Sequence, residues 1–144
     1  MKEQLKIIGA LKIYLNGELK VDTTNMIVTA GKDWVTARLK DATPSDLEMS
    51  YMAVGTDSTA AAAGQTALLA ELDRNALSTA GGTVSTNTIT YDCTWAAGDG
   101  TGALTEAGIF NDPSAGTMAA RTVFSTINKG AGDTVTISWV WTIS

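Results

Sequence analysis

Apolar residues recur at every second position in several segments of this chain, an alternation typical of β-strands with one buried face. Near the amino end, apolar and polar residues alternate from Leu11 to Leu15. The dipeptide Asn16-Gly17 follows, and because both residues tolerate positive φ it predicts a tight turn. We therefore expect a hairpin in which the segment ELKVDTTNMIV returns as the second strand.

The same alternation dominates the chain from Thr83 onward. The segments NTITYDCTW and DTVTISWVWTIS place aromatic and β-branched residues on one face and mostly threonine or serine on the other. The runs AAGDGTGA, NDPSAG and NKGAGD supply turns between them. Short strands separated by such turns predict a mainly β domain, an antiparallel β-sandwich or a jelly-roll-like fold.

Two segments favour a helix instead. Apolar residues spaced four apart predict a short helix over residues 31–40, which Pro44 prevents from continuing. The segment TALLAELDR has Leu68 and Leu72 four apart and predicts one or two helical turns. Between these segments, MSYMAVGTD predicts a strand and STAAAAGQ a surface loop.

The length of 144 residues fits one domain with its own core, and no repeat or Pro/Ser-rich linker divides it. We therefore expect a single domain over residues 1–144, with residues 1–9 as a possible extended segment. Lys6 and Lys12 interrupt the apolar residues of the amino end. This end is neither a secretory signal nor a membrane span, and no membrane partner is expected.

Charge and composition exclude several classes of chemistry. The net charge of −5 repels polyanions, so nucleic acid is not an expected partner. The chain has no histidine, which removes serine-histidine triads and imidazole metal sites. Cys93 is the only cysteine, and the chain has no histidine that could act as its basic partner. It is therefore interpreted as a small buried apolar residue. We expect no enzyme and no cofactor.

Glu106 is the carboxylate that most resembles a catalytic acid, because it lies among small and apolar residues in TEAGIF. A glycosidase would pair it with Asp99 or Asp112 at about 5 to 10 Å across a cleft. The favoured alternative is a cross-strand ion pair with Arg121 in the hairpin closed by NDPSAG. Such a pair would help to fix strand register and contribute about 0.2 to 1 kcal/mol. No catalytic residue is therefore predicted.

Other candidate sites also have a structural interpretation. The run GDGTG at 98–102 lacks the following helix and lysine of a phosphate-binding loop, so it predicts a turn. Asp99, with Asp57 or Asp133, does not have the spacing of a calcium-binding loop, so no metal ligands are predicted. Tryptophans on alternating strand faces are used more often in a core than as a sugar platform. The four tryptophans are Trp34, Trp95, Trp139 and Trp141.

A resemblance to a known family adds to these patterns. The segments MSYMAVGTDSTAAAAGQTALLAELDR, NTITYDCTWAAGDGTGALTEAGIFND and GTMAARTVFSTINKGAGDTVTISWVWTIS resemble small virion structural proteins of tailed bacteriophages. The strongest part is TEAGIFN, followed by ARTVFSTINKG and the Thr/Trp-rich last strand. Members of such families are variously named head decoration or tail fibre proteins. The resemblance implies a virion component made in the cytoplasm of a bacterial host, and it carries over no catalytic residue.

Two functions follow from the resemblance. A decoration, or cement, protein would bind the outer surface of the assembled head, with the major capsid protein as its partner. A tail or tail-fibre-associated protein would contact tail proteins or bind a receptor. The lack of fibre-like repeats favours decoration. The apolar run from Trp139 to Trp141 would make an edge strand that needs covering, which predicts self-association, most simply as a homotrimer.

Overall fold

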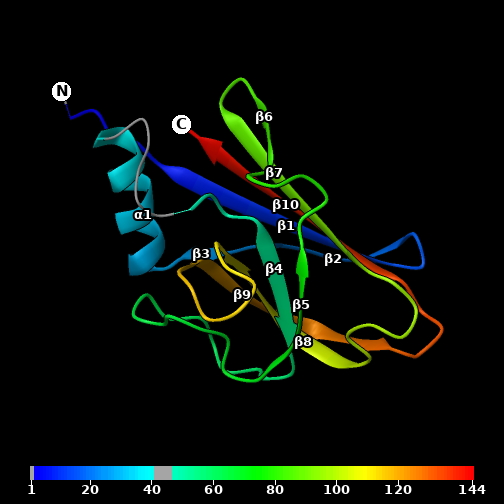
Figure 1. Cartoon of the computed structure of the whole chain (residues 1–144). Helices are drawn as coiled ribbons and strands as arrows, with labels where there is room; N and C mark the ends of the chain where they lie inside the picture. The colour runs from blue at the N-terminus through cyan, green and yellow to red at the C-terminus, as the bar shows by residue number, and fades with distance from the viewer. Residues whose placement is uncertain (1, 41–46) are drawn as a thin grey trace.

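The computed structural model describes residues 2–40 and 47–144, which form two antiparallel five-stranded sheets (Figure 1). Sheet A has the strand order β2 (Glu18–Thr24), β1 (Ile7–Leu15), β10 (Val135–Ile143), β7 (Thr88–Trp95) and β6 (Thr83–Ser85). Sheet B has the order β3 (Met26–Ile27), β9 (Met118–Lys129), β8 (Gly102–Phe110), β4 (Tyr51–Gly55) and β5 (Glu71–Ala76). The predicted mainly β fold is confirmed, and the two sheets make a β-sandwich.

Side chains from both sheets form one apolar core. Every second residue is buried from Tyr91 to Trp95 in β7 and from Val135 to Trp141 in β10, as the alternation in the sequence predicts. Among the largest buried side chains of this core are Trp95, Trp139, Tyr91, Leu11, Ile13, Met52, Leu104 and Ile109. Burial of each large apolar side chain contributes about 1.5 to 3 kcal/mol, so this layer is the main source of stability.

Strand β10 does not lie at an edge, and the expectation of an edge strand is wrong. It pairs with β1 on one side and with β7 on the other. Trp139 and Trp141 are 0% and 2% exposed and belong to the core, as the favoured interpretation of the tryptophans predicted. The two tryptophans therefore pack in the core while Val140 is half-buried on the other face, and the run no longer gives an edge-strand reason for self-association.

The first hairpin forms over part of the predicted range: β2 ends at Thr24, and Met26–Ile27 of the expected return strand pair instead with β9 in sheet B. Asn16 and Gly17 have φ values of 49° and 81°, so the turn needs residues that tolerate positive φ. At the other end of β1, the backbone N–H of Lys6 donates to the Ser144 oxygen at 2.8 Å, and the N–H of Ser144 donates back at 2.9 Å. The predicted extended segment is therefore shorter than residues 1–9, because β1 begins at Ile7.

Helix α1 (Thr29–Lys40) begins two residues before the predicted range and packs against β9. A β-carbon at Gly31 would overlap the backbone oxygen of Ala119, so the close approach of helix and strand requires glycine at this position. Pro44, the predicted helix stop, lies outside the described residues. Among the residues that the structure describes, no helix has the length and apolar character needed to cross a bilayer.

The predicted helical turns in TALLAELDR are wrong. Residues 56–70 instead form a long segment without regular structure, and β5 begins at Glu71 beside β4. Leu68 is buried in a second apolar cluster with Phe110 and Met118. Pairing with β4 satisfies backbone hydrogen bonds along both strands, and this tertiary contact overrides a weak local helix preference.

Candidate functional site

Glu106 and Arg121 lie together between sheet B and the segment 56–70. Both side chains are 0% exposed. Oxygen Oε2 of Glu106 accepts a hydrogen bond from Nε of Arg121 at 2.9 Å, and Nη2 of Arg121 lies 2.8 Å from the same oxygen. The two residues come from neighbouring strands, where Glu106 is opposite Val123 and Arg121 is opposite Gly108. The predicted ion pair across this hairpin is confirmed.

The same two side chains hold the segment 56–70 in place. The Glu106 carboxylate accepts the backbone N–H of Ala70 at 2.8 Å and that of Leu69 at 3.1 Å. Nη1 of Arg121 donates to the backbone oxygen of Thr59 at 2.9 Å and to Oε1 of Gln65 at 3.1 Å. Each charged group therefore bridges a strand of sheet B and the segment that covers it.

Burial changes the predicted energy of this ion pair. A value of about 0.2 to 1 kcal/mol applies to a cross-strand pair in contact with water. When one partner of a fully buried pair is removed, the other charge stays in the interior without compensation, which costs about 3 to 5 kcal/mol. The value for an exposed pair therefore does not describe the loss of one partner here, because the covering segment removes both groups from solvent.

Glu106 does not meet the geometry of a glycosidase acid. A reacting carboxyl group must touch its substrate, whereas the side chain of Glu106 has no exposed surface. Asp99 is exposed in the turn between β7 and β8. Asp112 lies in the turn between β8 and β9, where its carboxylate accepts the N–H of Ser114 at 2.9 Å. The Glu106 carboxylate therefore bonds to Arg121 and to the segment 56–70 and does not face a substrate.

The aspartates considered for calcium have local structural partners. Oδ1 of Asp133 accepts Nδ2 of Asn16 at 2.8 Å, and its Oδ2 accepts the N–H of Gly130 at 2.8 Å. These bonds, the Asn16 bond first, hold the pKa of Asp133 below its ordinary value of 3.8. Hydrogen bonds from Thr59 likewise lower the pKa of Asp57. Within residues 2–40 and 47–144, no group of three acidic or cysteine side chains is placed to hold a metal ion.

Cys93 lies in the core, where burial raises the pKa of its thiol to about 12. It is therefore protonated at neutral pH and behaves as the predicted small apolar residue.

Trp34 differs from the three core tryptophans because it is half-buried on α1, where its Nε1 donates to the backbone oxygen of Leu47 at 3.0 Å. The guanidinium of Arg38 lies over the Trp34 ring, 4.8 Å from its centre.

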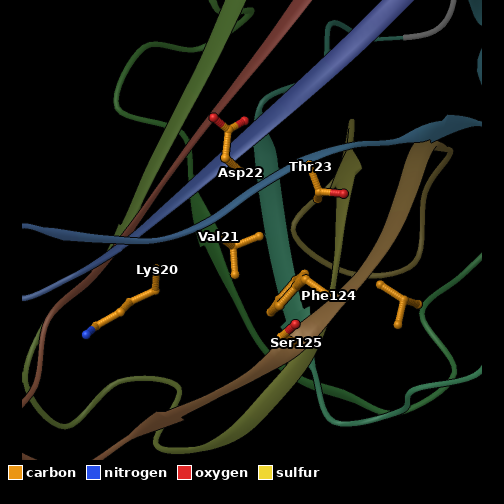
Figure 2. A pocket seen from close by; sticks show the side chains of 7 residues that line it. Lys20, Val21, Asp22, Thr23, Phe124 and Ser125 are labelled. Carbon is orange, nitrogen blue, oxygen red and sulfur yellow. The ribbon is translucent and has the colours of Figure 1, made fainter.

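An open groove of about 430 Å³ separates β2 from the second half of β9 (Figure 2). Val21 points from β2 toward β9 and approaches Phe124, whereas Asp22 points to the opposite side of β2. Lys20, at one end of the groove, lies 3.1 Å from Glu18. The remaining lining side chains offer hydroxyl and aliphatic groups, so the groove holds no paired acid and base. It marks the place where the two sheets separate.

A second depression, of about 210 Å³, lies between α1 and sheet A and is almost wholly apolar. It is lined by Ile7, Trp34, Val35, Arg38, Ile89, Tyr91, Trp141 and Ile143. Two further depressions of about 190 and 220 Å³ adjoin it, the first sharing Ile7 and the second sharing Ile89 and Ile143. Figure 1 shows the start of β1 and the end of β10 extending past sheet B on the side of α1, with β6 farther from the helix.

Exposed apolar side chains surround this depression. Leu5, Leu39 and Val84 are 70%, 77% and 71% exposed, and Ile143 is 43% exposed. We call these four residues and the lining of the three depressions the apolar end. Alternation in the sequence marks the inner face of sheet A, but it does not show that sheet B leaves part of this face uncovered.

Comparisons of the chain with protein-family models, curated proteins and solved structures found no match. Function has to be inferred from the residues and their arrangement. Glu106 and Arg121 form a buried ion pair that holds the fold together, and the groove beside β2 lacks an acid–base pair. The apolar end is a surface that a binding partner would cover.

Proposed function

We propose that the chain is a structural protein of a tailed-bacteriophage virion, a decoration protein that binds the outer surface of the assembled head and stabilises it. The apolar end is the observation that carries the proposal, because exposed apolar side chains gathered at one end of a small domain are typical of a protein that binds another protein. The phage class comes from the resemblance of TEAGIFN and ARTVFSTINKG to virion proteins. The major capsid protein is the proposed partner, after synthesis in the cytoplasm of the host.

The residues that carry the resemblance have structural roles in this fold. TEAGIFN forms most of β8, supplies Glu106, and ends at Asn111, whose Oδ1 accepts the N–H of Thr117 at 2.7 Å. ARTVFSTINKG forms most of β9 and supplies Arg121. The strongest part of the resemblance therefore describes a scaffold, which agrees with a structural role and gives no support to an enzyme.

Binding to an assembled head stabilises it by mass action. A ligand that binds the intact shell but not separated coat subunits contributes about 2.7 kcal/mol per site at a free concentration of about 100 times its dissociation constant. Many modest contacts over the shell are then sufficient. A homotrimer would also present several copies of one binding surface, which raises avidity without a strong individual contact.

The proposal is tested with heads purified without the protein. Added wild-type protein should occupy repeated sites on the shell in cryo-electron microscopy and raise the temperature at which the heads release DNA. Val84→Glu places a charge on the apolar end and should reduce binding at least tenfold. Leu19→Glu is the matched control, since Leu19 is 46% exposed on β2, outside the apolar end. Density confined to the tail, with unchanged head stability, would support the tail-associated alternative instead.

A further inference from the structure

The apolar end exposes part of the inner face of sheet A. Ile89 and Ile143 continue the alternation of β7 and β10, so their side chains point to the same face as the buried residues of these strands. Residues directly opposite each other in paired strands share a face. Val84 is opposite Ile89, and Ile7 is opposite Ile143, so these two also belong to the inner face. We call Ile7, Val84, Ile89 and Ile143 the apolar ladder.

Helix α1 covers only one side of this ladder. The ladder crosses the neighbouring strands β1, β10, β7 and β6 in that order. Trp34 and Val35 of α1 line the depression next to Ile7, and Figure 1 shows β6 farther from the helix than β1. Val84 on β6 is 71% exposed. The β6 side of the ladder is therefore open to solvent.

The open strip has about the width of one helix. Neighbouring strands are about 4.8 Å apart, so β1 and β6, three spacings from each other, are about 14 Å apart. An α-helix with its side chains is about 10 to 12 Å across. Two helices that pack side by side have axes about 8 to 10 Å apart. A second helix next to α1 would therefore lie over the middle of the ladder.

An extended segment would fit this surface less well than a helix. The face of a sheet presents side chains, so the backbone of an extended segment would find no hydrogen-bond partners on it. A helix satisfies its own backbone groups and presents apolar side chains at i, i+4 and i+7 along one face. The three depressions follow one another along the ladder, since they share Ile7 on one side and Ile89 and Ile143 on the other. They offer separate places for three such side chains.

The charged side chains that line the three depressions are both basic. Lys32 and Arg38 come from α1, and the neighbouring Asp33 lines none of the three. Lys32 is exposed, and the guanidinium of Arg38 lies over the Trp34 ring. The border of the open strip next to α1 is therefore positive, and acidic side chains on the flank of an incoming helix would complement it.

We propose that the apolar end binds one amphipathic α-helix of the partner, with apolar side chains in the three depressions and acidic side chains next to α1. Removal of the apolar ladder from water provides the attraction, and Lys32 and Arg38 set the orientation of the helix. The inference rests on the proposed function for the identity of the partner, the major capsid protein. The kind of element that binds is tested without phage heads.

Three synthetic peptides of about 18 residues test the inference, a length at which an alanine-rich chain forms a helix in water. The acidic helix has leucines at i, i+4 and i+7 and glutamates along one flank. The basic helix has lysines in place of the glutamates. The third peptide is the acidic one with a central proline, which breaks the helix. Trp34 and Trp141 line the central depression, so tryptophan fluorescence reports binding, and NMR titration locates it.

We expect the acidic helix to bind wild-type protein, and the basic helix and the proline peptide to bind at least tenfold more weakly. Val84→Glu should weaken binding of the acidic helix at least tenfold. Lys32→Glu should remove the preference for the acidic over the basic helix. The control is Leu19→Glu, on β2 outside the apolar end, which should bind as wild type does. Circular dichroism checks that each variant is folded.

Four results would overturn the inference. They are no binding of the acidic helix up to millimolar concentration, equal binding of the proline peptide, equal binding of the basic helix, and a wild-type dimer in ultracentrifugation that Val84→Glu abolishes. The second result would mean that an extended segment occupies the surface, and the last that a second copy covers it. Heads that bind wild type but not Val84→Glu would still support decoration, so the two proposals fail separately.

Discussion

The Glu106 carboxylate joins two strands and a covering segment, which makes its charge more important than its size. Glu106→Gln keeps the shape but removes the carboxylate 2.8 Å from the buried Arg121 guanidinium, which leaves only the partly exposed carboxylate of Asp57 at 3.8 Å as its counter-ion. We expect the free energy of unfolding to fall by up to about 3 to 5 kcal/mol. Urea denaturation followed by tryptophan fluorescence measures this change.

The matched control for this prediction is Glu18→Gln. Glu18 pairs with Lys20 at 3.1 Å, but the two side chains are 73% and 39% exposed. An exposed pair contributes about 0 to 1 kcal/mol, so this variant should unfold almost as wild type does. Equal losses in the two variants would show that solvent reaches the Glu106–Arg121 pair.

Asp133 gives a second prediction at the level of single residues, in its dependence on pH. Its pKa is lowered in the folded state, so its bonds to Asn16 and Gly130 are favoured above the ordinary value of 3.8 and are lost as pH falls through the lower folded value. NMR signals of the Asn16 side-chain amide should therefore shift in acid, below pH 3.8. Asp133→Asn should remove this transition; an unchanged profile in the variant would assign the titration to another group.

Helix α1 is placed by a contact that only glycine allows. Gly31→Ala introduces a methyl group where the backbone oxygen of Ala119 lies, so helix and strand must move apart. Overpacking of this kind costs about 1 to 3 kcal/mol. Gly64→Ala is the control, because a methyl group there meets nothing within 4 Å and its φ is not in the left-handed region. It should be neutral or stabilising by about 0.4 to 1 kcal/mol. Thermal melting of both variants compares them, and equal stability would contradict the close contact.

Elements whose evidence is local were predictable from the sequence. The alternation in β1, β7 and β10 and the Asn16-Gly17 turn were sufficient to identify strands, and the spacing of apolar residues identified α1. Strand β5 was not predictable in this way. Its sequence ELDRNA has little β-propensity, and it becomes a strand because the edge of β4 is available to pair with it. The central place of β10 also depends on partners distant in sequence.

The candidate site shows the same limit. The Glu106–Arg121 pair was predictable because both residues belong to one hairpin. Its burial was not, since Ala70 and Leu69, which bond to the carboxylate, precede it by 36 and 37 residues. The apolar end depends on where sheet B stops relative to sheet A. No local pattern contains that information.

At the scale of the whole molecule, the core joins both sheets, so neither sheet should unfold alone. The same apolar cluster contains Trp139 from sheet A and Ile109 from sheet B. We expect one calorimetric transition with an enthalpy of about 100 kcal/mol, from a typical value of about 0.7 kcal/mol per residue. Agreement between calorimetric and van't Hoff enthalpies checks this. Two resolved transitions would mean that the segment 56–70 and its apolar cluster melt separately.

The pairing of β1 with β10 has a consequence for the order of events during synthesis. Ile7 leaves the ribosome well before its partner Ile143, because the whole of the rest of the domain lies between them in the sequence. Until then, β1 lacks its neighbour at the centre of sheet A, and its apolar face has no complete layer to pack on. Contacts so distant in sequence slow folding, and partly folded chains with open strand edges aggregate readily. A nascent chain of this protein therefore exposes an unfinished sheet A until β10 has been made, and during that time we expect it to be a client for chaperones.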